Sequence, residues 1–332
     1  MNMISSYKGG RCMKKMILSI ILLMTFSLVF GLTPAENGWV FDLEAHRGGR
    51  GLMPENTISA FRYAIERIGV TTLELDVAVT KDMIPVLSHD PFLNPQKVSI
   101  NGKFITERPL IKDLTYAELV QYDFGIMRYD YVMPGQLQIA YEKIPTLEQV
   151  FELIKLEHER TGNKYMLNVE LKVFPDVFGY TYDAQTFVNI VVPLIEKYGF
   201  EDTVMIQSFN WKVLKLVKIK NSQITTVALV QSIYIGSTLW TDGLRLADFG
   251  IDAVKMAKFI GADVLSPYYK ECDVSMIKRA HESGIAIIPW TIDDQNEMKK
   301  FVDLGVDGII TDYPNLLREI LLSKGINLPA PS

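Results

Sequence analysis

The sequence predicts an α/β protein built as a (β/α)8 barrel of the TIM type. Its 332 residues, 48% of them hydrophobic and 22% charged, are enough for one barrel of roughly 250 residues. Beyond residue 36, short apolar segments alternate with amphipathic segments, and a glycine often precedes the next apolar segment. This composition excludes a disordered, collagen-like or disulfide-stapled protein. The formal net charge of −5 gives no electrostatic sign of nucleic-acid binding.

The barrel strands are predicted from runs that are apolar almost throughout, which is typical of parallel strands covered on both faces. The predicted strands are Val40–His46, Leu73–Val79, Tyr165–Leu171, Val204–Ser208, Thr225–Val230, Asp263–Ser266, Ile285–Trp290 and Gly308–Thr311. A doubly wound open sheet is the alternative. It would need a dinucleotide-type glycine loop after the first strand, and Gly48-Gly49-Arg50-Gly51 lacks that spacing.

The helices between these strands carry ordinary end signals. Asn56 or Thr57 is expected to cap the helix after the first strand. Thr146 and Gln149 form a capping box before the helix that precedes the third strand. The helix predicted at Asp273–Ser283 is followed by a glycine, the usual residue just past a helix. Alternating strands and helices of this kind favour the closed barrel.

Residues 1–35 are predicted to be a signal peptide outside the fold. Lys14 and Lys15 precede the apolar run Met16–Phe30, and small residues up to Ala35 offer a cleavage site. A membrane anchor is the alternative, but the run is shorter than the ~20 residues that span a bilayer. We therefore expect a secreted protein, periplasmic or extracellular, with no stable membrane span after cleavage. Cleavage would leave Cys272 without an internal disulfide partner.

Residues 36–325 are predicted to form a single catalytic barrel domain, with residues 326–332 as a tail. Two segments interrupt the strand–helix alternation. Residues 91–145 are rich in Pro, Gly, Asp and Tyr and are predicted to be an inserted excursion over the C-terminal mouth of the barrel; residues 231–250 are similarly irregular. Loops of this length are usually lids, binding surfaces or disordered segments.

Acidic side chains stand on strands that should otherwise be apolar. Glu74 and Asp76 are two residues apart on one strand and therefore share a face, which on a barrel strand is the interior. Two buried carboxylates repel each other unless a cation lies between them. Glu170, on the next barrel strand, can supply a third oxygen. An all-oxygen site suits one divalent cation, Ca²⁺ or Mg²⁺, although ion pairs with Arg or Lys remain an alternative.

A β-hairpin is predicted directly after the second strand. Only residues 80–83 separate Val79 from the next apolar run, too few for a crossover to a parallel strand. With Lys81 and Asp82 as a two-residue turn, His89 lies opposite Glu74 and on the same face. A bulge or a longer turn would shift this register by one residue.

Two histidines and two basic residues are predicted at the same end of the barrel. His46 ends the first strand, and the hairpin returns His89 toward the acids. Two imidazoles beside a cation can act as an acid–base pair near neutral pH. Arg47 and Lys172 add positive charge there. The combination indicates phosphate chemistry.

Several short motifs resemble the glycerophosphodiester phosphodiesterase family over roughly residues 41–325. They are His46-Arg47-Gly48, Pro54-Glu55-Asn56-Thr57, Leu73-Glu74-Leu75-Asp76-Val77, Pro85-Val86-Leu87-Ser88-His89-Asp90, Glu170-Leu171-Lys172, Gln207-Ser208-Phe209, Pro289-Trp290-Thr291 and Thr311-Asp312-Tyr313-Pro314. The resemblance implies a TIM-type barrel, a Ca²⁺ or Mg²⁺ site and two catalytic histidines. It also implies hydrolysis of small glycerophosphodiesters to glycerol 3-phosphate and an alcohol.

The resemblance also assigns roles to individual residues. They are His46 and His89 as the acid–base pair, Glu74, Asp76 and Glu170 as metal ligands, Arg47 and Lys172 as phosphate contacts, Trp290 as a wall of the glycerol pocket, and Glu55 as a substrate contact or a brace of its loop. Ser88 and Met83 depart from the family's usual residues in the hairpin, but neither carries one of these roles.

Two other functions remain open at this point. A related phospholipase would act on lipid or lysolipid phosphodiesters and would need an apolar rim. Apolar residues within 123–141 could supply that rim, although packing of the excursion onto the barrel is the preferred interpretation. A catalytically inactive secreted binding protein would keep the barrel but lose a histidine or a carboxylate. The released alcohol, the acid and base assignments, the attacking oxygen and the oligomeric state are not specified by the sequence.

Overall fold

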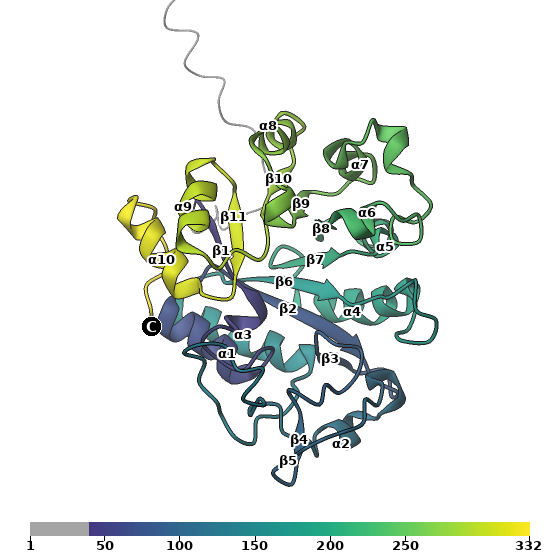
Figure 1. Cartoon of the computed structure of the whole chain (residues 1–332), viewed down its shortest axis with the longest axis vertical. Helices are drawn as coiled ribbons and strands as arrows, with labels where there is room; N and C mark the ends of the chain where they lie inside the picture. The colour runs from purple at the N-terminus through teal and green to yellow at the C-terminus, as the bar shows by residue number, and fades with distance from the viewer. Residues whose placement is uncertain (1–39) are drawn as a thin grey trace, which may run out of the picture. The chain divides into compact units, whose positions relative to one another are not determined.

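A computed structural model describes residues 40–332 and shows a parallel α/β barrel (Figure 1). The predicted signal peptide lies outside the described residues. Barrel strands follow the order β10-β9-β8-β7-β6-β2-β1-β11, and β3 pairs with β2 outside this path. The eight predicted strands correspond in chain order to β1, β2 and β6 to β11. The predicted α/β barrel is therefore confirmed.

The elements have these bounds. The strands are β1 Asp42–Ala45, β2 Thr72–Val79, β3 Pro85–Leu87, β4 Ser99–Ile100, β5 Lys103–Phe104, β6 Met166–Leu171, β7 Val204–Ser208, β8 Thr225–Val230, β9 Val264–Pro267, β10 Ala286–Ile287 and β11 Gly308–Thr311. The helices are α1 Ile58–Tyr63, α2 Tyr116–Leu119, α3 Leu147–Thr161, α4 Ala184–Tyr198, α5 Trp211–Lys220, α6 Ser232–Ile235, α7 Ala253–Phe259, α8 Val274–Glu282, α9 Gln295–Asp303 and α10 Pro314–Ser323.

The barrel closes between β10 and β11 through separate backbone hydrogen bonds. The amide of Asp307 donates to the carbonyl of Ile287 at 3.0 Å, and the amide of Ile310 donates to the carbonyl of Pro289 at 3.1 Å. The strand predicted for Ile285–Trp290 is limited to β10, because Pro289 has no N–H to donate to a ladder. The first predicted strand is also shorter, because His46 begins a tight turn in which Arg47 has φ 52°.

The predicted helix ends are largely confirmed. Thr57 caps α1 by accepting from the amide of Ala60, whereas Asn56 lies before the cap in a left-handed conformation. Thr146 and Gln149 form the expected capping box of α3. The irregular segment 231–250 holds α6 and a further short helical turn. Within residues 40–332, no helix is both long and apolar enough to cross a bilayer.

The barrel interior has an apolar side and a polar side. An apolar cluster comes from β7, β8, β9 and β11 and from the residue after β10; its members are Met205, Val227, Val264, Ile310 and Ile288. Strand register places acids and amides at the corresponding positions of β1, β2 and β6. They are Glu44 on β1, Glu74 and Asp76 on β2, and Asn168 and Glu170 on β6. The sequence therefore concentrates its buried polar groups on neighbouring strands.

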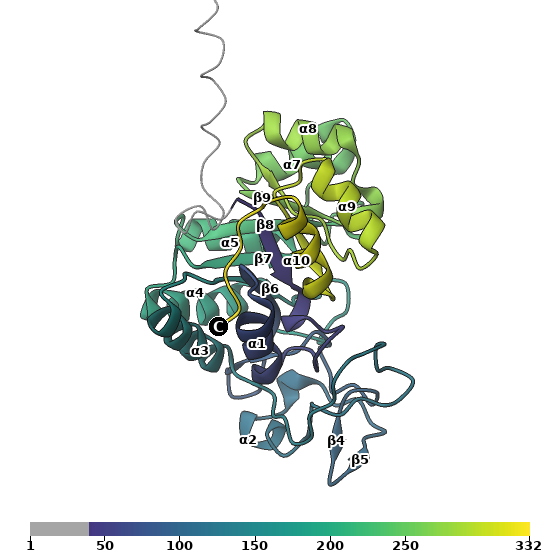
Figure 2. The ribbon, with the colours of Figure 1, turned by 90° about the vertical axis from the view of Figure 1, so that its left-hand side faces the viewer.

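Residues 91–145 form an ordered insert with a small core of its own. Leu93, Val98, Ile111 and Leu119 pack with Val86 of β3. Figures 1 and 2 both place α2, β4 and β5 to one side of the barrel strands, and Figure 1 shows β3 between them and the barrel. Backbone and side-chain hydrogen bonds from residues 136 and 137 reach the loop after β1. The insert therefore contacts both segments that follow the first two strands.

The apolar residues of 123–141 differ in how far they are buried. Phe124 packs against the core of the insert, and Met127 is buried. Tyr129, by contrast, is 91% exposed. The preferred interpretation, packing of the insert, therefore accounts for Phe124 and Met127 but not for Tyr129.

Candidate active site

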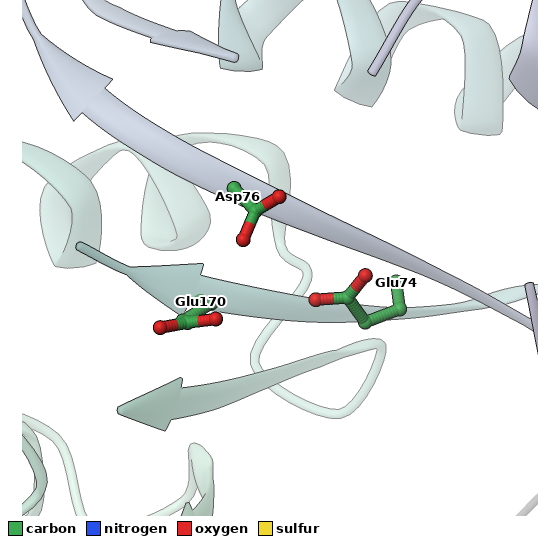
Figure 3. A group of neighbouring side chains, drawn as sticks. All are labelled: Glu74, Asp76 and Glu170. Atoms are coloured by element: carbon green, nitrogen blue, oxygen red, sulfur yellow. The ribbon is translucent and has the colours of Figure 1, made fainter. Parts of the chain in front are cut away.

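Three buried carboxylates meet inside the barrel. Glu74 and Asp76 extend from β2, and Glu170 on β6 lies level with Asp76 in the strand register. One oxygen of each residue lies within 4.8 Å of the others, and Figure 3 shows the three groups turned toward a common space. Oxygen-only donors of this kind suit hard divalent cations. The structure thus brings together the three predicted ligands, and they could hold a metal ion.

Hydrogen bonds from the surrounding loops and strands hold Glu74 and Asp76 in place. Glu74 accepts from the backbone amide of Arg47 at 2.8 Å and from the side-chain amide of Gln207 at 2.7 Å. Asn56 donates to Asp76 Oδ2 at 2.9 Å and accepts from the Asp76 backbone amide at 3.2 Å. Asn56 and Gln207 stand in the motifs noted above, but from the sequence Asn56 was considered only as a possible helix cap and Gln207 was given no role. Their contact with the acids depends on the barrel register.

Arg47 and Lys172 lie against the same three carboxylates. Arg47 Nε is 3.1 Å from Asp76 Oδ2. Lys172 Nζ is 2.9 Å from Glu170 Oε1 and 3.7 Å from Asp76 Oδ1. Part of the ion-pair alternative is therefore present. The three carboxylates together with Arg47 and Lys172 have a formal net charge of −1. A bound divalent cation would change that net charge to +1.

The pKa shifts follow from this arrangement. Burial acts to raise the pKa of Asp76, but the charges of Arg47 and Lys172 hold it well below its usual range. Burial and the neighbouring Asp76 raise the pKa of Glu74 well above its usual range. Burial also raises the pKa of Glu170 to about 7, although Lys172 opposes the shift. Burial therefore disfavours the ionised form of Glu74 and of Glu170.

His46 is held by an acid from the far end of the chain. Its Nδ1 lies 2.5 Å from Asp312 Oδ1, and its Nε2 lies 4.0 Å from Glu74 Oε2. Asp312 directly follows β11, which pairs with β1. Burial lowers the pKa of His46. Sequence reasoning missed Asp312 as a functional residue, although its place after a barrel strand was an available signal.

The hairpin that carries His89 differs from its predicted geometry. The amide of Thr80 donates a hydrogen bond to the carbonyl of Ile84 at 3.0 Å, which closes a three-residue loop. Within this loop Met83 has φ 63°. The register pairs Val77 with Leu87, so the predicted two-residue turn and the pairing of His89 with Glu74 are wrong by one residue. The left-handed residue that closes the loop is Met83 in place of the usual glycine, which hid this turn type.

His89 nevertheless reaches the site, because β3 ends at Leu87 and the following residues bend. His89 lines a cavity together with Glu170 and Lys172. Its Nδ1 lies 3.2 Å from Asp90 Oδ1. Burial, followed by the charge of Arg47, lowers the pKa of His89 to about 3. The structure therefore places both predicted histidines near the three carboxylates.

Glu55 lies within a buried network of ion pairs. Its carboxylate is 2.6 Å from Lys97 Nζ, 3.3 Å from Arg47 Nη1 and 3.3 Å from Arg50 Nε. Burial acts to raise the pKa of Glu55, but Lys97 and Arg47 hold it well below its usual range. Of the two roles considered for Glu55, these contacts favour the brace of its loop.

The cavity beside the acids has a volume of about 200 Å³ and two kinds of wall. Its polar wall holds His89, Glu170 and Lys172. Its aromatic wall is formed by Phe174, Phe209, Tyr234, Trp240 and Trp290. The indole N–H of Trp290 donates to the carbonyl of Ser266 at 2.8 Å, which fixes the ring. Such a cavity fits a small organic molecule with an anionic group at one end.

The chain is similar to known proteins over most of its length. The sequence model of the glycerophosphoryl diester phosphodiesterase family matches residues 46–316. A glycerophosphodiester phosphodiesterase of Caldanaerobacter subterraneus subsp. tengcongensis is 32% identical over 286 residues, which cover 85% of this chain and 98% of that protein. The range 46–316 matched by the family model includes every residue described above as part of the site.

Solved structures show the same fold. A crystal structure from Silicibacter pomeroyi matches with a TM-score of 0.78 at 24% identity, covering 90% of this chain and all of that one. A phosphodiesterase of Oleispira antarctica, in complex with the product sn-glycerol-3-phosphate, matches with a TM-score of 0.65 at 22% identity over 87% of this chain and 99% of that one.

Proposed function

The chain belongs to the glycerophosphoryl diester phosphodiesterase family, and on this premise we propose that it hydrolyses glycerophosphodiesters to glycerol 3-phosphate and an alcohol with one divalent cation, Ca²⁺ or Mg²⁺. The observation that carries the proposal is the convergence of Glu74, Asp76 and Glu170 beside two histidines. The Oleispira antarctica relative, solved with sn-glycerol-3-phosphate, supports the product.

The basic residues are suited to hold the phosphodiester. Lys172 lines the cavity, and Arg47 lies against Asp76 next to it, so both place positive charge where the anion would bind. A divalent cation held by the three carboxylates would stabilise charge on the phosphoryl oxygens. With that cation the group of three acids and two bases has a net charge of +1, which favours an anionic substrate.

The two histidines are suited to move protons. Each has a carboxylate beside Nδ1, Asp312 for His46 and Asp90 for His89. A carboxylate at Nδ1 favours the tautomer that leaves Nε2 free to accept or donate a proton. We propose that one imidazole takes a proton from the attacking oxygen and the other protonates the leaving alkoxide.

The aromatic wall is suited to the glycerol end of the substrate. Trp290 and Phe209 lie with their ring centroids 5.4 Å apart, and both line the cavity that also exposes Glu170 and Lys172. The carbon face of glycerol can pack on these rings while its phosphate lies at the polar wall. We propose Trp290 as the main contact of this kind.

Hydrolysis of soluble glycerophosphocholine tests the proposal. We expect release of glycerol 3-phosphate that stops when EDTA removes divalent ions and returns with Ca²⁺ or Mg²⁺. Lysophosphatidylcholine, assayed in parallel, tests the phospholipase alternative, which preferential hydrolysis of the lysolipid would favour. Absence of hydrolysis of both compounds in the presence of metal would indicate a binding protein and would overturn the proposal.

Secretion is a separate proposal that rests on the first 35 residues. We expect the protein expressed from its full sequence in a bacterial host to reach the periplasm or the medium with this segment removed. Mass determination of the mature protein measures the cleavage. An intact N-terminus in the cytoplasmic fraction would contradict it.

A further inference from the structure

We propose that Lys97, a residue of the insert, is a positioning residue for this reaction: its ammonium holds the two carboxylates that contact His89 and Arg47. The inference rests on the proposed function, because it concerns how that site is held. Lys97 lies outside the motifs that identify the family and had no role in the sequence analysis.

Lys97 lies between two acids in a buried position. Its Nζ is 2.6 Å from Glu55 Oε1 and 2.8 Å from Asp90 Oδ2. The residue is only 7% exposed, and its ammonium lies 5.3 Å from the centre of the Tyr131 ring. A charged amine in such a place is stable only with acidic partners, and both partners are present.

Each of these acids contacts a residue of the proposed mechanism on its other side. Asp90 Oδ1 lies 3.2 Å from His89 Nδ1, while Glu55 Oε1 lies 3.3 Å from Arg47 Nη1. One ammonium therefore supports a proton-transfer residue and a phosphate-binding residue, each through one carboxylate. The supporting charge comes from the insert rather than from the barrel.

The local backbone of the insert sets the position of Lys97. The amides of Lys97 and Val98 both donate to the carbonyl of Asn94, at 2.9 and 3.0 Å, which forms a tight turn. Val98 then enters the core of the insert. The insert thus supplies Lys97 to the ion pairs beside the proposed active site.

The two carboxylates held by Lys97, Glu55 and Asp90, do not depend on it equally. Glu55 also pairs with Arg47 and Arg50, so it keeps two cationic partners when Lys97 is lost. Asp90 has Lys97 as its lysine partner, and Asn94 donates to the same oxygen at 2.9 Å. Loss of the ammonium should therefore disturb His89 more than Arg47. The effect should fall on kcat more than on KM.

The test uses Lys97→Met and Lys97→Arg, with exposed Lys103→Met of the same insert as the matched control. For glycerophosphocholine hydrolysis we expect Lys97→Met to lower kcat by about 10- to 100-fold with little change in KM, as loss of a supporting contact commonly does. Lys97→Arg should keep most of kcat, and Lys103→Met should match the wild type. A kcat for Lys97→Met equal to that of Lys103→Met would overturn the inference.

A double-mutant cycle with Asp90→Asn separates positioning from folding. If Lys97 acts through Asp90, adding Lys97→Met to Asp90→Asn should lower kcat little further, and removing both charges should preserve the fold. A large further loss of kcat on adding Lys97→Met to Asp90→Asn would overturn the inference, and this comparison does not require Lys97→Met alone to fold. A wild-type protein without activity would instead reject the proposed function.

Discussion

Two neighbouring strands of the barrel carry the same short pattern, an acid, a leucine and an acid, yet the two pairs have different surroundings. On β1 the pair is Asp42 and Glu44, and on β2 it is Glu74 and Asp76. All four side chains are buried. Glu44 lies level with Thr72, two residues before Glu74, so the β1 pair is one layer deeper in the barrel.

The contacts of the deeper pair are neutral. Asp42 accepts from the hydroxyls of Thr71 and Thr72 at 2.8 and 2.5 Å, and Glu44 accepts from Asn168 at 2.8 Å. Burial raises the pKa of Asp42 and raises that of Glu44 well above its usual range. A protonated Glu44 can donate to Asp42, which satisfies oxygens that two carboxylates would leave unpaired.

The comparison shows that an acid-x-acid pattern on a barrel strand does not identify a metal site by itself. The upper pair has Arg47 and Lys172 beside it and Glu170 opposite, so at least one of its acids stays ionised. The deeper pair has only neutral donors and favours a proton. Its depth and its neighbours, rather than the residue types, make it structural.

The largest expected difference between the two layers is in catalysis. Glu170→Gln should lower kcat/KM by at least about 10³-fold, because a metal ion contributes several kcal/mol to stabilising transition-state charge. Glu44→Gln should leave kcat/KM within about twofold, because Glu44 lies one layer below the proposed site and would touch no reacting atom. Steady-state hydrolysis of glycerophosphocholine measures both. Equal losses in the two variants would remove the distinction between the layers.

The histidines above the upper layer should come next in size. His46→Ala and His89→Ala should each lower kcat by roughly 10²- to 10⁴-fold while the protein stays folded, because each removes a proton-transfer group. His281→Ala is the matched control, since His281 pairs with Asp307 on the outside of the barrel. Near-wild-type turnover in either test variant would exclude that histidine from the mechanism. Circular dichroism checks the fold.

The pH dependence of metal binding should sharpen the comparison. Metal must displace protons from the upper carboxyls, and the pKa of Glu170 without metal is about 7. The apparent affinity for Ca²⁺ or Mg²⁺ should therefore fall as the pH decreases below 7, by about tenfold per pH unit for each proton displaced. Titration calorimetry at several pH values measures this slope. Glu44→Gln should keep it, and an affinity that is flat from pH 8 to pH 5 would contradict it.

The smallest expected effect is on stability and belongs to the deeper layer. Because the folded state raises the pKa of Glu44, the stability due to its proton is present at low pH and is lost as the pH rises through the raised value. Glu44→Gln keeps a neutral donor at every pH, so its Tm should exceed that of the wild type by a few degrees at pH 8, with a smaller gain at pH 5. Thermal unfolding of both proteins at pH 8 and pH 5 measures this difference. A Tm of Glu44→Gln below that of the wild type at pH 8 would contradict the prediction.

The sequence predicted most of the barrel and the meeting of the upper acids. Alternation with a period of two put Glu74 and Asp76 on one face, and parallel neighbouring strands put Glu170 at the same end. The position of the hairpin that carries His89 depends on an irregular backbone conformation, which the residue pattern does not predict. Met83 adopts a left-handed conformation usually taken by glycine, so the hairpin register was predicted one residue away.

Other parts of the site could not be predicted because they join distant segments. Asp312 reaches His46 only after the barrel closes, since 266 positions separate the two in the chain. Lys97 reaches Glu55 from an insert that lacks any strand or helix periodicity around it. The deeper acids have the same pattern as the upper ones, and only the strand register shows that they lie one layer lower.

The most direct test of the central claim is a crystal structure of the protein soaked with Mn²⁺, which suits the same oxygen ligands and can be located by its anomalous scattering. We expect one ion per chain bound by Glu74, Asp76 and Glu170, with none at Asp42 and Glu44. An ion bound at the deeper pair, or carboxylates that remain in their ion pairs while the added metal binds elsewhere, would contradict the account.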